Sequence, residues 1–250
     1  MNKLCFKSLL FLTLSLKCFS QVSISPDNMI GVNTIASAGS KTSKSVLGLK
    51  IREYAPGGVV SSDNPNVEGS PYLFKNWFNK STIWLDDNIV KLDFVNYNIE
   101  NESFEIKMDM VDDSILIVKP SVKVNKVKIN NNVFKPYLDN ELQRTSFFEV
   151  LWESGNHAFL TKYKLKVIDG PIDPLTKAYI KPKKYSYNKF YFFLENEIMN
   201  PIKLKKSEIL KLINPTYVND VKSFVKKQKL KYNRTSDINK ILTYYYSIKS

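Results

Sequence analysis

The stretch NIVKLDFVNYNIENESFEIKMDM, residues 88 to 110, decides the class of fold. Its apolar residues alternate with polar ones, first at Val90, Leu92 and Phe94 and then at Phe104, Ile106 and Met108. A period of two residues is that of a β-strand with one buried face, because successive side chains of a strand point to opposite sides. The polar segment NIENE between the two runs has the composition of a turn. The stretch therefore predicts two antiparallel strands joined by a short turn.

The same alternation extends in both directions from this pair of strands. Further strands are expected at residues 82–85, 114–119, 122–129, 147–152 and 157–168. The last two are joined across ESGN, where Gly155 can adopt the positive φ of a hairpin turn. Trp152 is expected in the core, on one alternating face with Phe148 and Val150. About seven or eight strands within residues 70–168 predict an antiparallel β-meander that forms a curled sheet, a partly open barrel or a sandwich.

The strand pattern breaks at DGPIDPLTKAYIKPKK, residues 169–184, where three prolines and a glycine interrupt it. We expect a linker there, either a domain boundary or a long connection. Residues 185–250 then predict a basic β-hairpin and a small helical subdomain, so the fold class is α+β. The expected hairpin strands are residues 185–195 and 201–205, and the expected helices begin near Ser207, at Pro215 and at Thr235 or Ser236.

Apolar residues recur at helical spacing in the last two of these helices. One face of the first carries Tyr217, Val221, Phe224 and Val225, and one face of the second carries Ile238, Ile241, Leu242, Tyr245 and Ile248. The chain end therefore predicts packed amphipathic helices and not a disordered basic arm. Tyr245 is expected to point into the core, while Tyr244 and Tyr246 cover its edges.

The first 20 residues have the features of a secretory signal peptide. Lys3 and Lys7 precede an apolar run from Leu9 to Leu16, and Ser20 ends the segment. The run is shorter than the about 20 apolar residues that cross a membrane as a helix. We therefore expect cleavage after Ser20 and export to the periplasm or the extracellular space.

Both cysteines, Cys5 and Cys18, fall inside this leader. A lipoprotein with Cys18 as the lipidated residue is an alternative, but Lys17 stands where such sites carry a small residue. The mature chain then has neither disulfides nor cysteine-ligated zinc. Residues 21–69, rich in Ser, Asn and Gly, predict a loosely ordered segment with one strand near residues 46–54.

Charge is distributed unevenly along the chain, whose formal net charge is +13. Residues 21–160 hold 14 Lys and Arg against 17 Asp and Glu, whereas residues 161–250 hold 20 against 7. An excess of cations at one end favours an anionic partner such as a lipid, a polysaccharide or an acidic protein. The alternative is that these lysines only keep a small helical domain in solution.

The candidate binding surface follows from the lysine spacing in the second helix and the segment after it. We expect an anionic partner to bind Lys222, Lys226, Lys229, Lys231 and Arg234. Stacking of nucleic-acid bases on Tyr232, Tyr244 and Tyr246 is the competing interpretation of the same region. Export disfavours nucleic acid as the partner. The function predicted is therefore that of an exported binding protein of the cell envelope or the extracellular space.

A secreted hydrolase with a dispersed carboxylate site is the alternative from another class. Glu149 and Glu153 are expected on one outward side of a strand, although about 13 Å between their Cα atoms exceeds the about 5 to 9.5 Å of a glycosidase pair. A pocket that joined an acid to Trp77 or Trp84 would favour this alternative. The single histidine, His157, is expected at the surface. The chain shows no nucleophile elbow, zinc-binding helix or phosphate loop, so we assign no catalytic residue, metal or cofactor.

Three parts of the chain resemble one group of proteins. They are GSPYLFKNWF (69–78), FFEVLW (147–152) and the ending from KKSEILKLI through KKQKLKYN to INKILTYYYSI. These motifs are similar to uncharacterised secreted or periplasmic proteins of Gram-negative bacteria of the Bacteroidetes type, over about residues 69–250. The resemblance implies an exported β-rich body with a helical end, and it implies no activity.

Overall fold

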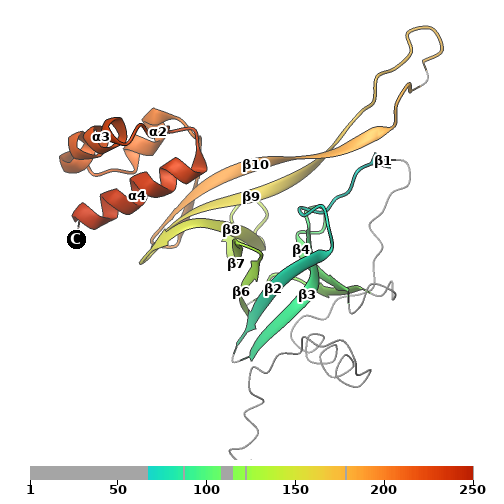
Figure 1. The fold of residues 1–250 in the computed structure, drawn as a ribbon, viewed down its shortest axis with the longest axis horizontal. Helices are drawn as coiled ribbons and strands as arrows, with labels where there is room; N and C mark the ends of the chain where they lie inside the picture. The colour runs from blue at the N-terminus through green and yellow to red at the C-terminus, as the bar shows by residue number, and fades with distance from the viewer. Residues whose placement is uncertain (1–66, 87, 108–114, 122, 178, 250) are drawn as a thin grey trace, which may run out of the picture. The chain divides into compact units, whose positions relative to one another are not determined.

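The computed structural model describes residues 67–86, 88–107, 115–121, 123–177 and 179–249. They form an open, largely antiparallel sheet of eleven strands, followed by three small α-helices (Figure 1). The predicted β-rich body with a helical end is thereby confirmed. The predicted signal peptide and the predicted strand at residues 46–54 lie outside the described residues.

The strands follow one another mostly as neighbours, in the spatial order β1-β10-β9-β8-β7-β6-β2-β3-β4-β5, with β11 also paired to β10. All pairs are antiparallel except β1 with β10. The strands are β1 (Val67–Glu68), β2 (Phe78–Leu85), β3 (Asn88–Asn98), β4 (Ser103–Lys107), β5 (Ile115–Val118), β6 (Val124–Ile129), β7 (Asn132–Asp139), β8 (Arg144–Ser154), β9 (His157–Ile168), β10 (Lys183–Glu195) and β11 (Ile198–Ile202).

Strand β7 was not predicted from the sequence. Pro136 stands in its middle, and proline is rare in central strands. The pairing explains why proline is tolerated here. The ladder between β6 and β7 ends at Phe134, so Pro136 is paired only with Phe147 of β8. The missing N–H of Pro136 therefore removes no hydrogen bond from the β6 side.

A β-bulge in β8 reverses the expected alternation of its last residues. Val150 pairs with Leu160 of β9 and Trp152 pairs with Phe159, so Leu151 is the extra residue. Each residue after the bulge therefore points to the side opposite from the one that regular alternation predicts. The expectation that Trp152 shares a face with Val150 is wrong for this reason.

The segment with three prolines connects two strands of one hairpin. β9 and β10 pair over twelve residue pairs, from His157 with Glu195 to Ile168 with Lys184. The strands on both sides of residues 169–182 therefore belong to the same sheet. From Lys162 onward, β10 is the one strand paired with β9 among the described residues.

The helical end comprises α2 (Lys206–Lys211), a 3₁₀ turn at Pro215–Tyr217, α3 (Val218–Lys227) and α4 (Thr235–Lys249). The first helix begins near Ser207, as expected, but its N-cap is Lys205, whose side chain makes no capping hydrogen bond. Pro215 begins the 3₁₀ turn, where the Asn214 side chain accepts the N–H of Thr216. α4 begins at the expected Thr235.

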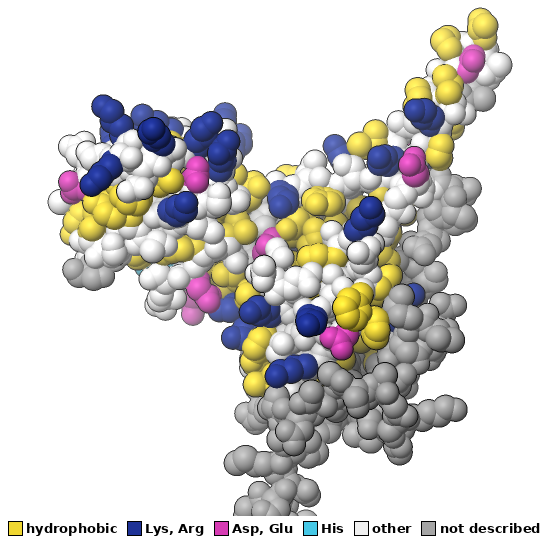
Figure 2. Space-filling model, viewed as in Figure 1, with side chains coloured by type: hydrophobic (Ala, Val, Ile, Leu, Met, Phe, Trp, Pro, Cys, Tyr) yellow, Lys and Arg dark blue, Asp and Glu magenta, His cyan; other side chains and the backbone are white. Residues whose placement is uncertain are grey.

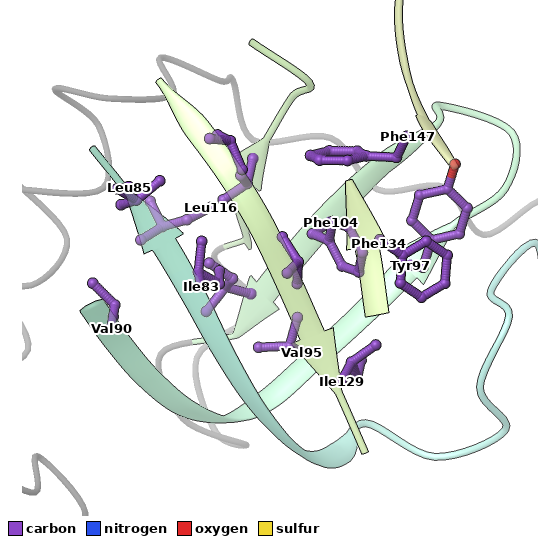
Figure 3. Close-up of a cluster of buried hydrophobic side chains, with 14 of the residues drawn as sticks. Ile83, Leu85, Val90, Val95, Tyr97, Phe104, Leu116, Ile129, Phe134 and Phe147 are labelled. Atoms are coloured by element: carbon purple, nitrogen blue, oxygen red, sulfur yellow. The ribbon is translucent and has the colours of Figure 1, made fainter. Parts of the chain in front are cut away.

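One hydrophobic core lies on one face of strands β2 to β8. Tyr97, Phe104, Phe134 and Phe147 meet at one end of it, and Ile83, Leu85 and Val90 lie at the other (Figure 3). Aromatic rings pack at short range, with centroid distances of 5.2 Å between Tyr97 and Phe134 and 4.9 Å between Phe104 and Phe147. Burial of these large apolar side chains supplies the main stabilisation of the sheet.

A second core joins the sheet to the helical end. Phe159 and Phe193 of the sheet pack with the apolar faces of α3 and α4, including Val221, Ile241 and Tyr245. The predicted faces of both helices are thereby confirmed, and Tyr245 is buried as expected. The Trp152 indole N–H donates to Thr243 Oγ1 at 3.1 Å, and the Asn239 amide donates to the Leu151 carbonyl at 2.6 Å.

Two buried tyrosines predict opposite effects of the same substitution. The Tyr97 hydroxyl is buried and has no hydrogen-bond partner among the described residues, whereas the Tyr163 hydroxyl donates to the buried Glu149. Tyr97→Phe should raise the free energy of unfolding by about 1 kcal/mol, because an unpaired polar group leaves the core. Tyr163→Phe should lower it by about 1–3 kcal/mol, because a buried carboxylate loses its donor. Urea denaturation measures both; destabilisation by Tyr97→Phe of the same size as by Tyr163→Phe would contradict this assignment.

Candidate functional site

The five predicted binding cations lie on α3 and on the connection from α3 to α4. Lys222, Lys226, Lys229, Lys231 and Arg234 are all exposed. Lys222 and Lys226 are one helical turn apart, so they share a face of α3. Figure 2 shows Lys and Arg side chains gathered over the helical end. These five residues are called the basic helical surface below.

The end of α3 places Lys229 by a specific backbone motif. The N–H of Leu230 donates to the Val225 carbonyl at 3.0 Å, and the N–H of Lys229 donates to the Lys226 carbonyl at 3.2 Å. This pair of bonds is a Schellman motif, in which the residue after the helix takes a left-handed conformation. Lys229 has a φ of 53°, in a position where glycine is usual. Helix α3 therefore ends at Lys227, although the helical spacing of apolar residues in the sequence continues to Leu230.

The connection between the helices is fixed by Asp237. Its Oδ2 accepts the backbone N–H of Lys231 at 3.0 Å, and the Arg234 carbonyl accepts the N–H of Asp237 and of Ile238. Asp237 also lies in the first turn of α4, where a negative charge is favourable. Lys231 and Arg234 are therefore presented on an ordered turn.

Positive charge in this region is weakly compensated. Residues 203–249 contain 12 Lys and Arg but only 3 Asp and Glu. Within the described part of this region one ion pair is formed, between Lys211 and Glu208 at 2.9 Å. The side chains of the basic helical surface therefore form no ion pair among the described residues, and like charges held together favour an external anion.

The tyrosines of α4 are engaged in packing. The Tyr244 ring stacks on Phe224 with a centroid distance of 4.0 Å and an interplanar angle of 6°. The Tyr246 ring packs against Trp152 at 4.9 Å and against His157 at 5.0 Å. This packing leaves less aromatic surface for stacked bases, which supports the preference for partners other than nucleic acid.

Glu149 and Glu153 do not share an outward face, contrary to expectation. They pair with Thr161 and Ala158, which are three residues apart on β9 and therefore on opposite faces. The bulge at Leu151 causes the change. Glu149 is buried and accepts hydrogen bonds from Tyr163 and Asn132, while Glu153 is half-exposed and pairs with Lys135 at 2.5 Å. The two carboxylates therefore cannot act on one substrate.

The tryptophans considered for a carbohydrate pocket are engaged with cations and not with acids. Lys107 lies 4.8 Å from the ring centroid of Trp77, and Lys126 lies 4.3 Å from that of Trp84. Such contacts are cation–π interactions between partly exposed groups. Neither tryptophan borders an acidic pocket in the described structure.

His157 lines an open pocket of about 430 Å³ together with Ser154, Tyr246 and Lys249. Ser154 and Glu195 are its cross-strand neighbours on β8 and β10. The His157 Nε2 lies 3.5 Å from Glu195 Oε1, and no hydrogen bond joins Ser154 to His157 among the described side chains. A serine nucleophile is activated by a hydrogen bond to a histidine, which is in turn oriented by a carboxylate. Ser154, His157 and Glu195 are therefore not arranged for nucleophilic catalysis.

A hollow of about 420 Å³ on β2, β3 and β6 carries a second group of lysines. Lys91 and Lys128 flank Thr82 from the two neighbouring strands, and Lys80 lines the same hollow, as does Asp93. These lysines provide a control for experiments on the basic helical surface.

A buried ionic cluster was missed by the sequence analysis. The Lys162 ammonium lies 2.6 Å from Asp139 Oδ2 and 2.9 Å from Glu102 Oε1. Glu102 also accepts from Ser146 at 3.0 Å and pairs with Arg144 at 3.1 Å. The Ser146 hydroxyl is buried and has no access to substrate. The cluster is therefore structural, and local patterns do not reveal it because its members come from three separate parts of the chain.

Comparisons with protein-family models, curated proteins and solved structures found no match to this chain. In the described residues, no group of three or more His, Cys, Asp or Glu side chains is placed to hold a metal ion. None of the helices described here has the length and apolar character needed to span a bilayer.

The ionic cluster predicts a distinctive response to pH. Burial would raise the pKa of Asp139, but hydrogen bonds from Lys162 and from the N–H groups of Leu142 and Glu141 outweigh it and hold the pKa below its usual value. A carboxyl with a lowered folded-state pKa stabilises the fold above its unfolded pKa of about 3.9, and this stabilisation is lost as the pH falls through the folded-state pKa.

Lys162→Met should therefore lower the free energy of unfolding at pH 7 by about 3–5 kcal/mol, because two buried carboxylates lose their cation. The variant should also lose less stability than the wild type on acidification from pH 5 to pH 3, because protonation now relieves an unpaired charge. Urea denaturation across this range measures both effects. The exposed Lys164→Met is the control, and equal losses in the two variants would contradict the role of the cluster.

Two glycine substitutions separate charge from backbone strain in the basic helical surface. Lys229→Gly should raise the free energy of unfolding by about 0.5–1 kcal/mol, because glycine accepts a positive φ without a Cβ clash. Lys222→Gly, in the middle of α3, should lower it by about 0.5–1 kcal/mol. Thermal denaturation compares two variants that lose the same charge. Destabilisation by both would show that Lys229 is not in the left-handed conformation.

Proposed function

We propose that the protein is an exported, non-enzymatic binding protein of the cell envelope or the extracellular space. Its basic helical surface holds an anionic partner, whose class is an anionic lipid, a polysaccharide or an acidic protein. The observation that carries the proposal is the exposure of all five cations on an ordered helix and turn, with no ion pair from any of them to an acidic side chain among the described residues.

Export is supported by the leader-like pattern of the first 20 residues, with Lys3 and Lys7 ahead of an apolar run. The charge difference between the two parts of the chain supports an anionic partner. Packing supports a rigid presentation, because α3 and α4 bury their apolar faces against Phe159 and Phe193. The cations therefore keep their arrangement, and binding costs less conformational entropy than it would in a disordered arm.

The rival hydrolase has less support than the binding protein. Its two named carboxylates point to opposite faces of the sheet, and one of them is committed to Tyr163 and Asn132. The pocket beside His157 has no activated nucleophile. A binding function is therefore the better account of the described surface.

The proposal predicts the effect of replacing Lys222, Lys226, Lys229, Lys231 and Arg234 by Gln together. The variant should bind vesicles that contain phosphatidylglycerol, or a soluble polyuronate, at least about tenfold more weakly at low salt, because each cation near an anionic surface contributes about 1 kcal/mol. The wild-type affinity should fall as salt is raised towards physiological strength, and the affinity of the variant should change less.

A matched control replaces by Gln five exposed lysines that lie in or next to strands of the sheet: Lys75, Lys80, Lys91, Lys119 and Lys128. This variant loses the same charge and should keep most of the wild-type affinity for the polyuronate. If the two variants lose equal affinity, net charge and not the helical surface is responsible. Unchanged binding in the helical variant would place the binding surface elsewhere.

A further inference from the structure

Exposed apolar side chains concentrate on the hairpin of β9 and β10. Eight of the thirteen large hydrophobic residues that are exposed in the described structure lie between Val167 and Phe190. The most exposed is Leu175, at 92%, followed in this hairpin by Ile180 at 61%. These residues are Val167, Ile168, Ile172, Leu175, Tyr179, Ile180, Tyr187 and Phe190. Such a concentration of large exposed apolar side chains in one hairpin indicates a site of interaction.

The turn of this hairpin is held by specific bonds. The N–H of Ile180 donates to the Pro171 carbonyl at 2.8 Å, and Ile172 forms a β-bridge with Tyr179. The Asp173 side chain accepts the N–H of Leu175 at 2.8 Å. Gly170 is required for this packing, since a Cβ there would lie 2.0 Å from the Lys181 carbonyl oxygen. Residues 169–177 and 179–182 therefore present Leu175 and Ile180 on an ordered turn, and these residues are called the hairpin tip below.

The apolar surface is found on both faces of the hairpin. Val167 and Ile168 are successive residues of β9, so their side chains point to opposite faces, and they are 47% and 46% exposed. A groove on a partner protein accepts one face of a ribbon. A lipid interface accepts apolar side chains from every side of a segment that enters it, which makes it the better match.

Cations surround this apolar surface. Residues 164–189 hold seven lysines and two aspartates, and Asp169 is already paired with Lys183 at 2.9 Å. Lys164, Lys166 and Lys184 stand behind the tip, and Lys177 and Lys181 lie within it. Lysines beside an apolar tip are complementary to anionic headgroups beside acyl chains.

We propose that the hairpin tip binds the surface of an anionic lipid bilayer, with Leu175 and Ile180 at the boundary of the acyl chains and the lysines among the headgroups. The contact is peripheral, at a depth of about 5–10 Å, as for other interfacial segments. The Asp173 carboxylate accepts two backbone N–H groups, which lower its pKa and favour its charged form. A charged carboxylate is costly to place among acyl chains, so Asp173 limits the depth of the contact. This site is separate from the basic helical surface and does not depend on it.

The first experiment uses Tyr179→Trp in the full chain, added to vesicles of phosphatidylglycerol and phosphatidylcholine and to vesicles of phosphatidylcholine alone. Relative to the wild type, the added tryptophan should shift its emission to shorter wavelength and be quenched by brominated acyl chains on the anionic vesicles. No shift and no quenching at lipid concentrations that bind the protein would overturn the proposal.

The second experiment measures partition onto the same vesicles by sedimentation. Leu175→Ser should weaken binding to anionic vesicles about tenfold, because one fully exposed leucine loses its transfer into lipid. Leu138→Ser, which alters another exposed leucine on β7, should leave partition unchanged. Gly170→Ala keeps every side chain of the tip but distorts it, and it should weaken binding as Leu175→Ser does. Thermal denaturation checks that the variants fold.

The outcomes separate this site from the basic helical surface. Loss of vesicle binding in Leu175→Ser with unchanged binding to polyuronate supports the hairpin tip alone. Loss of both kinds of binding only in the five-residue helical variant, with Leu175→Ser unaffected, overturns the hairpin proposal and leaves the proposed function standing. Self-association of the wild type without lipid, abolished by Leu175→Ser, would make a second copy of the chain the occupant and also overturn it.

Discussion

The antiparallel ladder between β9 and β10 is the interaction on which the rest of the structure depends. Its twelve residue pairs run from His157 with Glu195 to Ile168 with Lys184. At one end, β10 continues through β11 into the helices, and at the other it carries the hairpin tip. The basic helical surface and the hairpin tip are therefore attached to a single pair of strands. The middle of this pair is buried, with Tyr163 in the first core and Phe159 in the second.

The buried ionic cluster lies where this ladder parts from its neighbour. Thr161 is the residue of β9 nearest the tip that still pairs with β8, and Lys162 follows it directly. The Lys162 ammonium then contacts Asp139 at the end of β7 and Glu102 in the turn between β3 and β4. An ion pair in the interior gives little net stability. The cluster does fix the point where β9 parts from β8, because a shift of β9 along its neighbours would leave these buried charges unpaired.

The sequence predicted what periodicity can reveal. Alternation at Val90, Leu92 and Phe94 located β3 within one residue, and helical spacing identified the buried face of α4, including Tyr245. Periodicity did not reveal strand β7, which carries Pro136 beyond the end of the β6 ladder. The prolines of residues 169–184 predicted a domain boundary or a long connection, and the structure has a long connection between two strands of one hairpin.

For the candidate site, too, periodicity predicted some features and could not predict others. The exposure of Lys222 and Lys226 follows from helical spacing alone. The face on which Glu153 lies does not follow from periodicity. The extra residue Leu151 turns each later side chain of β8 to the opposite face, and no feature of the composition marks a bulge. The ionic cluster around Lys162 joins segments that are up to 60 residues apart, so no local pattern could reveal it.

The two surfaces differ in how they would hold an anionic partner. The helices that carry the basic helical surface bury their apolar residues inside the protein. The surface therefore offers charge alone, and salt should weaken its binding. The hairpin tip adds exposed apolar side chains, whose transfer into lipid is not screened. Salt would therefore distinguish the contributions of the two.

Amide hydrogen exchange along β9 and β10 of the free protein tests the ladder most directly. Continuous pairing predicts slow exchange in the buried middle, from Phe159 to Tyr163, and graded but measurable protection as far as Ile168 and Lys184. Exchange at the rate of an unstructured chain from Lys164 onward would contradict the ladder, and with it the ordered hairpin tip.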